Sequence, residues 1–202
     1  MPFRLLVEGP DDLHLIGHLL SEHGVILKDR EIRACGGVEP LLDEHLPVEI
    51  KGSYTSLGIV VDADLDVRSR WQSIRDRLAQ LGYDMPGEPQ PNGLIVTTRR
   101  PAVGIWVMPD NVLPGILEDF VKQLVPPDDD LWPLVESSVA AIPVPSRRFP
   151  PAAVRKAEIH TYLAWQEQPG TKMGSAITNR YFHANAQLAL TFVEWIKRLR
   201  AQ

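Results

Sequence analysis

Two acidic clusters, each directly after a short apolar run, constrain the fold of this chain most. The first cluster, Glu8-Gly9-Pro10-Asp11-Asp12, follows residues 3–7 (FRLLV). The second cluster, Asp62-Ala63-Asp64-Leu65-Asp66, follows residues 57–61 (LGIVV). Short apolar runs of this kind predict buried strands of a parallel sheet. Ligands of open α/β sheets bind beyond the carboxyl ends of the strands, so we expect the acids to gather at one edge.

Carboxylates gathered in this way need a cation. Like charges a few ångströms apart raise one another's pKa, and sites made only of oxygen ligands suit Mg²⁺ or Mn²⁺. In an extended segment Asp62 and Asp64 would point to the same side, roughly 6–7 Å apart, to hold one ion or straddle two. Asp66 has the same parity, but it is also expected to start the next helix. The alternative for Glu8, Asp62 and Asp64 is helix capping or turn formation, which explains one acid but not a set on two strands. The alternative for Asp12 is a favourable interaction with the dipole of the helix that it begins.

Length and composition predict one compact α/β domain. The chain has 202 residues, 44% of them hydrophobic, and we expect a core over residues 1–125 with a helical extension over 126–202 packed on it. No apolar stretch approaches the ~18–20 residues that span a bilayer, and the start lacks a secretion signal, so a cytoplasmic location without a membrane partner is expected. The single cysteine, Cys35, excludes an internal disulfide and a zinc ribbon. The net charge of -5 gives no global attraction to nucleic acid, so any such contact must be local or metal-bridged.

The pattern along the chain alternates between strands and helices. Strands are expected over residues 3–7, 31–35, 57–61, 94–98 and 103–108. Helices are expected after Gly9, over 38–45, from Val67 to Gly82, from Pro114, and over 131–141, 153–166 and 184–200. A loop rich in Pro and Gly is expected over residues 85–93.

Glu8 after the first strand and Asp62-x-Asp64-x-Asp66 after a later one resemble the Toprim pattern, over roughly residues 3–120. Toprim domains serve topoisomerases, bacterial primases, small ribosomal-RNA maturases and the overcoming-lysogenization-defect nucleases. The sequence is most similar to the nuclease branch and to short bacterial Toprim-like proteins with a Val-Glu-Gly-x-x-Asp start. The resemblance implies a Rossmann-like, mostly parallel central sheet flanked by helices, followed by a helical C-terminal portion.

The resemblance also implies roles for individual residues. It places Asp12 among the metal ligands, matches Glu118-Asp119 to a downstream acidic pair with Glu118 preferred, and matches Lys156 to a lysine on a later helix. The predicted activity is Mg²⁺- or Mn²⁺-dependent hydrolysis of DNA or RNA. In this hypothesis Asp62 and Asp64 hold the metal, Glu8 and Asp12 complete its shell, Glu8 orients or deprotonates the attacking group, and Lys156 neutralises developing charge.

Missing motifs narrow the choice within that family. The chain has no G-x-x-x-x-G-K-[ST] motif, no Cys/His zinc module of the primase kind, and too few residues for the strand passage of a topoisomerase. The expected partners are therefore nucleic acid and a separate ATPase or other protein, and a homodimer is left open.

Three other interpretations stay open. One is a Toprim-like binding or regulatory module without catalysis. Another is a phosphatase of the haloacid-dehalogenase type, since Asp62-x-Asp64 follows an apolar strand, although the following Gly-Thr is absent and Glu8 is left unexplained. The third is zinc binding by His14 and His18, which have an i, i+4 spacing but no evident third ligand.

Overall fold

A five-stranded sheet forms the centre of the computed structural model, which describes residues 2–202. The strands are β1 (Phe3–Val7), β2 (Ile32–Ala34), β3 (Ser56–Asp62), β4 (Leu94–Val96) and β5 (Ala102–Met108), in the spatial order β2-β1-β3-β5-β4. Neighbouring strands are parallel except β4, which runs antiparallel to β5. The predicted α/β fold with a mostly parallel sheet is confirmed.

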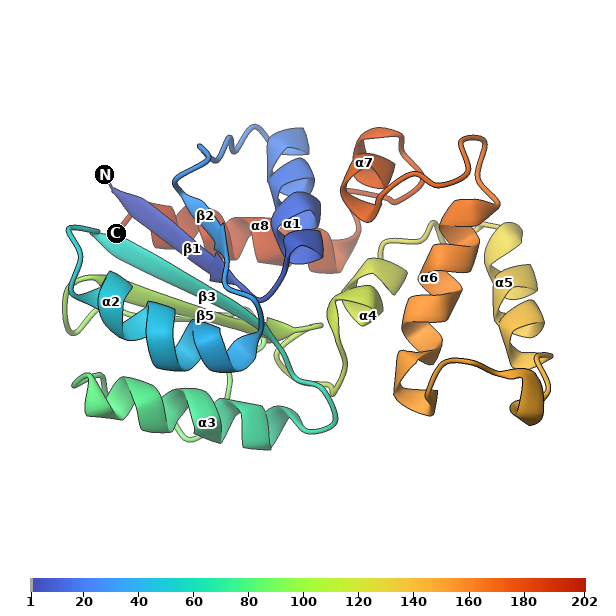
Figure 1. Cartoon of the computed structure of the whole chain (residues 1–202). Coiled ribbons are helices and arrows are strands. Elements are labelled where there is room, and N and C mark those ends of the chain that lie inside the picture. The colour runs from blue at the N-terminus through green and yellow to red at the C-terminus, as the bar shows by residue number, and fades with distance from the viewer. Residues whose placement is uncertain (1) are drawn as a thin grey trace.

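Helices cover both faces of the sheet and continue beyond its carboxyl edge (Figure 1). The segment η1 (Pro40–His45) with α2 (Leu46–Ile50) and the helix α3 (Val67–Gln80) lie on one face, and α1 (Pro10–Glu22) and α8 (Gln187–Arg200) lie on the other. The helices near the carboxyl ends of the strands are α4 (Leu117–Lys122), α5 (Leu131–Ala140), α6 (Val154–Ala164) and α7 (Met173–Thr178). Two short 3₁₀ turns, η2 (Val144–Ser146) and η3 (Pro151–Ala153), lie between α5 and α6.

The alternation of side chains along the strands divides the core into two clusters. Val60 of β3 belongs to the cluster under α1 and α8, whereas its neighbours Ile59 and Val61 belong to the cluster under α3. Successive residues of a strand point to opposite faces, so a strand covered on both faces is apolar throughout, as residues 57–61 are. The α5, α6 and α7 helices contribute to the first cluster. The division at residue 125 stays a prediction.

A pair of glycines lets α8 approach the middle of the sheet. Gly58 of β3 and Gly104 of β5 are register partners, and a Cβ atom at either position would clash with Leu199 of α8 or Leu5 of β1. The C-terminal helix therefore packs directly against the two central strands.

Several boundaries differ from those expected. The strand expected over residues 94–98 ends at Val96, and the helix expected over 153–166 covers Val154–Ala164. The helix expected over 38–45 does begin at residue 38, but it is π-helical from Pro40 to His45 and continues into α2. The six-residue α7 was not predicted, because a segment of that length shows too little periodicity. None of the helices within residues 2–202 combines the length and apolar character that a membrane crossing requires.

Candidate functional site

Four of the six acids predicted as metal ligands meet in one cavity of about 340 Å³ at the carboxyl edge of the sheet. They line it from different elements: Glu8 after β1, Asp12 of α1, Asp62 at the end of β3 and Glu118 of α4. Lys156 of α6 lines it as well, and the exposed Asp11 lies at its rim. We call this cavity the carboxylate pocket.

The parallel register of β1 and β3 brings Glu8 and Asp62 together. Val7 is the partner of Val60 in the sheet, and the backbone N–H of Asp62 donates a hydrogen bond to Glu8 Oε1 at 2.8 Å. Glu8 is thus held by the neighbouring strand, with its carboxylate at the point where both strands end.

Asp12 enters the pocket because of how α1 begins. Pro10 occupies the first turn, where its missing N–H is not needed, and Gly9 is the N-cap. Asp12 Oδ2 accepts a hydrogen bond from the Gly9 N–H at 3.0 Å. One oxygen of Asp12 therefore binds the N-cap residue of the helix, while the side chain also lines the pocket.

Asp62 carries the strongest electrostatic signature of the site. Its Oδ1 atom is buried and has no hydrogen-bond partner among residues 2–202. Burial, followed by repulsion from nearby carboxylates, raises the pKa of Asp62 to about 9; the carboxylates belong to Glu8, Asp12, Asp64 and Glu118. A carboxylate in this position needs a positive partner in order to be ionised at neutral pH.

Two further acids of the pocket show the same effect. Burial raises the pKa of Asp12 to about 7, against the lowering by its hydrogen bond from Gly9. Burial also raises the pKa of Glu8, while the N–H of Asp62 and the charge of Arg70 lower it. The negative charge of the pocket is therefore only partly balanced by the chain itself.

The two acids of α4 point to different places. Glu118 is 4% exposed and lines the carboxylate pocket, where its Oε1 lies 3.5 Å from Lys156 Nζ. Asp119 accepts a hydrogen bond from Arg155 Nε at 3.0 Å and lines a second cavity, of about 450 Å³. Successive helix residues are about 100° apart around the axis, so only one of the pair can enter the pocket.

The second cavity also contains Asp64 and Glu158, and each of its acids has an arginine partner. Asp64 Oδ2 lies 2.5 Å from Arg70 Nη2, and Arg155 pairs with Asp119 and, at 2.6 Å, with Glu158. We call this cavity the arginine-paired pocket.

The extended arrangement expected for residues 62–66 is wrong. The β3 strand ends at Asp62, and Asp64 has a left-handed backbone with φ of 56° and forms an isolated bridge with Gly115. Asp64 therefore does not project beside Asp62 as it would along a strand, and it lines the arginine-paired pocket instead.

Asp66 is the N-cap of α3 and not a wall of the carboxylate pocket. Its Oδ1 accepts a hydrogen bond from the Arg68 N–H at 3.0 Å, and its Oδ2 accepts one from Ser69 Oγ at 2.6 Å. These bonds lower the pKa of the exposed Asp66 carboxyl. Its position agrees with the expected helix start and places it outside the set of candidate ligands.

Sequence reasoning missed Arg70. Its Nε donates to the backbone carbonyl of Asp62 at 2.8 Å, and its guanidinium also binds Asp64. The only signal in the sequence is its place in the first turns of the helix that follows the acids, a place that Arg68 shares.

Gly36 and Gly37 were expected to form a turn, and their N–H groups both donate to the Glu8 carbonyl at the wall of the pocket.

The acidic side chains of the carboxylate pocket suit a hard cation, because the atoms that would bind it are all carboxylate oxygens. As arranged, however, the described residues 2–202 contain no group of three or more His, Cys, Asp and Glu side chains that could hold a metal ion. Binding of a cation by Glu8, Asp12, Asp62 and Glu118 would therefore require their side chains to turn toward a common point.

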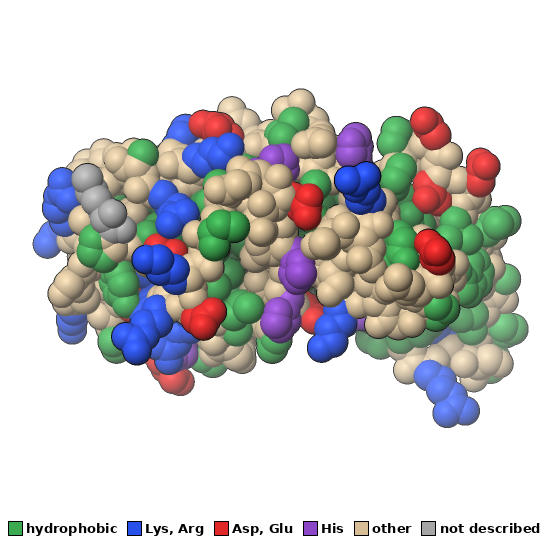
Figure 2. All heavy atoms as spheres, turned by 90° about the horizontal axis from the view of Figure 1, so that it is seen from above, with side chains coloured by type: hydrophobic (Ala, Val, Ile, Leu, Met, Phe, Trp, Pro, Cys, Tyr) green, Lys and Arg blue, Asp and Glu red, His purple; other side chains and the backbone are tan. Residues whose placement is uncertain are grey.

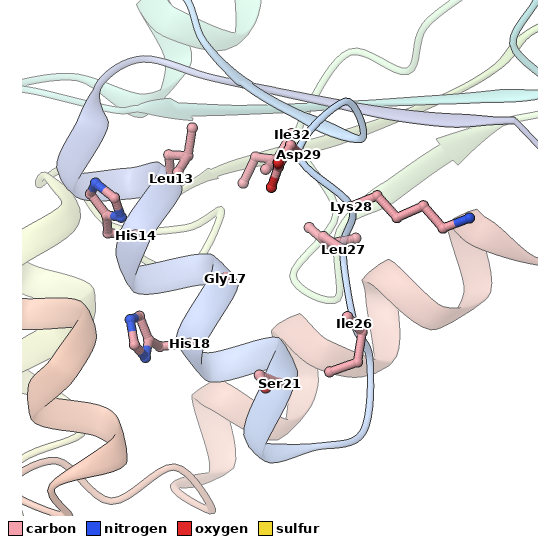
Figure 3. Close-up of a pocket in the computed structure, with 10 residues that line it drawn as sticks. All are labelled: Leu13, His14, Gly17, His18, Ser21, Ile26, Leu27, Lys28, Asp29 and Ile32. Atoms are coloured by element: carbon pink, nitrogen blue, oxygen red, sulfur yellow. The ribbon is translucent and has the colours of Figure 1, made fainter.

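The histidines of α1 lie outside this pocket. A mainly apolar cavity of about 470 Å³ separates α1 from the segment that leads into β2 (Figure 3). His14 and His18 project from the side of α1 that faces away from Ile26 and Leu27. His18 Nδ1 lies 2.9 Å from Thr178 Oγ1 of α7, so a hydroxyl group satisfies this ring nitrogen.

The fold and pocket thus define an α/β protein with an acidic cavity at the carboxyl edge of a mostly parallel sheet. The chain belongs to the family described as "Protein of unknown function (DUF3226)", whose model matches residues 2–201. No curated protein and no solved structure matches the chain.

Proposed function

We propose that this chain is a nuclease that hydrolyses phosphodiester bonds of nucleic acid with Mg²⁺ or Mn²⁺ in the carboxylate pocket. The observation that carries the proposal is the buried, unpartnered Oδ1 of Asp62, surrounded by other carboxylates at the ends of two neighbouring parallel strands. The resemblance of Glu8 and Asp62 to the Toprim pattern supports the same interpretation. A bound divalent cation would neutralise charge on the phosphodiester and lower the pKa of a water molecule.

Glu8 is the residue best placed to orient or deprotonate the attacking group. Its Oε1 is held by the Asp62 N–H, and within residues 2–202 its Oε2 accepts no hydrogen bond. One oxygen therefore fixes the side chain while the other is available for a proton. Asp12, Asp62 and Glu118 would be the cation ligands.

Lys156 would contribute positive charge at the edge of the pocket. Its ammonium group lies 3.5 Å from Glu118, and its side chain is 52% exposed. A lysine that is anchored at one side and open to solvent can approach a phosphate oxygen as charge develops there. An ATPase on a separate chain remains a prediction from the resemblance.

The test is cleavage of labelled single- and double-stranded DNA and RNA with Mg²⁺, with Mn²⁺ and with EDTA. We expect cation-dependent cleavage that Glu8→Gln and Asp62→Asn each reduce by about 10²–10⁴-fold, the range typical for loss of an acid-base group. Asp128→Asn is the matched control, because Asp128 is an exposed acid outside both pockets and should leave the rate unchanged.

A binding or regulatory module without catalysis is the second candidate. It is favoured by the lack, within residues 2–202, of a ready group of three metal-ligating side chains. Thermal unfolding separates the two: at about 100 times its Kd a cation that binds the folded chain stabilises it by about 2.7 kcal/mol. Stabilisation by Mg²⁺ or Mn²⁺ that Asp62→Asn removes would support the nuclease, whereas an unfolding temperature that neither cation raises would favour the module.

The haloacid-dehalogenase interpretation gains no support from the geometry. Asp64, which would act as the acid beside an Asp62 nucleophile, lines the arginine-paired pocket instead and is paired with Arg70.

A further inference from the structure

A further polar cavity, distinct from the arginine-paired pocket and of about 340 Å³, adjoins the carboxylate pocket. It lies between the start of α1, the C-terminal half of α6 and residues 170–173, and Pro10 and Asp11 line both cavities. Its other polar residues are His14, His160, Thr171 and Lys172. We call it the α1–α6 cavity.

Hydrogen-bond donors dominate this cavity. His14, His160 and Lys172 are all exposed, and none of their side chains has a hydrogen-bond or ion-pair partner in the part of the chain that the structure describes. An imidazole donates at least one N–H in either protonation state and an ammonium group donates three. On the face over α1 and α7, histidine side chains gather toward the middle, with Lys or Arg side chains beside them (Figure 2). Of the residues that the structure describes, Asp11 is the one carboxylate that lines the cavity.

The α6 helix connects the two cavities. Lys156 and His160 are four residues apart, so they lie on the same face, about one helical turn of 5.4 Å from each other. Lys156 lines the carboxylate pocket and His160 lines the α1–α6 cavity. Donors thus continue from the proposed reaction site into the neighbouring cavity.

We propose that the α1–α6 cavity binds a phosphate of a nucleic-acid strand, next to the phosphate that lies at the carboxylate pocket. The naming of nucleic acid as ligand rests on the proposed function, whereas the cavity and its donors stand independently. A strand in this position would run along α6, with one phosphate near Lys156 and the adjoining one near His160, His14 and Lys172. A single strand suits a cavity of this size, since the cavity has room for about one nucleotide.

The experiment measures binding of a fluorescein-labelled single-stranded oligodeoxythymidine by fluorescence anisotropy, in EDTA and over a range of salt concentrations. Lys172→Gln should weaken binding and reduce the magnitude of the salt slope by about 1, as expected for loss of one phosphate contact. Adding His160→Ala should weaken binding further. Asp11→Asn, which removes the opposing charge, should strengthen it.

Lys51→Gln is the control for net charge, because Lys51 is exposed and follows α2, away from both cavities. Equal losses in Lys51→Gln and Lys172→Gln would overturn the proposal, as would unchanged affinity in Lys172→Gln or no binding by the unmodified chain. Circular dichroism and unfolding of each variant confirm that it is folded. Because EDTA prevents cation-dependent cleavage, a positive result would stand even if the chain proved to have no nuclease activity.

Discussion

The carboxylate pocket and the arginine-paired pocket lie on either side of α4, and they differ in whether their acids have ion-pair partners. In the arginine-paired pocket the acids Asp64, Asp119 and Glu158 are all joined to Arg70 or Arg155. Among the described residues 2–202, Glu118 is the one acid of the carboxylate pocket with an ion pair, to the half-exposed Lys156, and Asp62 keeps a buried oxygen without a partner. Acids whose charge is balanced within the chain stabilise structure, while acids left unbalanced are available to a ligand.

Removal of Arg155 should have the largest effect on stability. Arg155→Met would leave the nearly buried Glu158 and the half-buried Asp119 without a cation, which should lower the free energy of unfolding by about 2 kcal/mol. That figure is below the 3–5 kcal/mol of fully buried pairs, because Arg155 is partly exposed to screening solvent. For a chain of this size the unfolding temperature should fall by about 4–8 °C, as measured by calorimetry.

The matched control is Arg68→Met, whose ion pair with Glu88 is exposed on both sides. Its unfolding temperature should stay close to that of the parent chain. An equal fall in both variants would show that the arginine-paired pocket has no special structural role.

The pH dependence of stability should reveal the carboxylate pocket. The pKa of Asp62 is about 9 in the folded chain and about 3.9 when unfolded, so between these values the folded chain binds more protons. Stability in EDTA should therefore fall as pH rises toward 9, with Asp12, whose pKa is about 7, adding to the fall below that pH.

Asp62→Asn should flatten the decline between about pH 7 and pH 9 and leave the variant about 1–2 kcal/mol more stable than the parent at the upper end. Urea unfolding at several pH values measures both quantities. The groups that face Asp62 are Glu8, Asp12, Asp64 and Glu118, so Asp128→Asn should keep the parent's slope. A parent chain whose stability rises over this range would contradict the assignment.

The smallest effect is expected at Arg70, which lies at the border of the two pockets. Its charge lowers the pKa of Glu8, and it binds both Asp64 and the Asp62 carbonyl. Arg70→Gln should make the carboxylate pocket more negative and raise its affinity for Mn²⁺ by roughly threefold to tenfold, as calorimetric titration would show. Weaker Mn²⁺ binding would instead indicate that Arg70 holds the ligands in place.

Local sequence patterns predicted the strands of the sheet and placed Glu8 and Asp62 at its carboxyl edge, whereas the pocket roles of Asp12, Glu118 and Lys156 came from the resemblance. Residues 57–61, and residues 3–7 apart from Arg4, are apolar because both faces of β1 and β3 are covered, and parallel pairing then places Glu8 beside Asp62. Glu118 was matched through the resemblance, and the turn of α4 carries it into the pocket while Asp119 points elsewhere.

Contacts between distant residues account for what the sequence did not indicate. The backbone of Asp64 turns away from the strand direction because it bridges to Gly115, about fifty residues later in the chain. Arg70 gains its role from that same turn, since its guanidinium then meets Asp64 and the end of β3. Neither contact produces a periodic pattern in the local sequence. The assumption that alternate residues of 62–66 point to the same side, as in a strand, therefore gave the wrong arrangement.

The approach of α8 to Gly58 and Gly104 has a consequence for how the protein is made. During synthesis on the ribosome, the residues of all five strands are added to the chain before those of α8, the helix that covers the middle of one sheet face. Contacts between segments so far apart along the chain form late, and they make folding slower. Ribosome-bound chains that end before residue 187 should therefore bind chaperones that recognise exposed apolar surface, and chains that include α8 should release them.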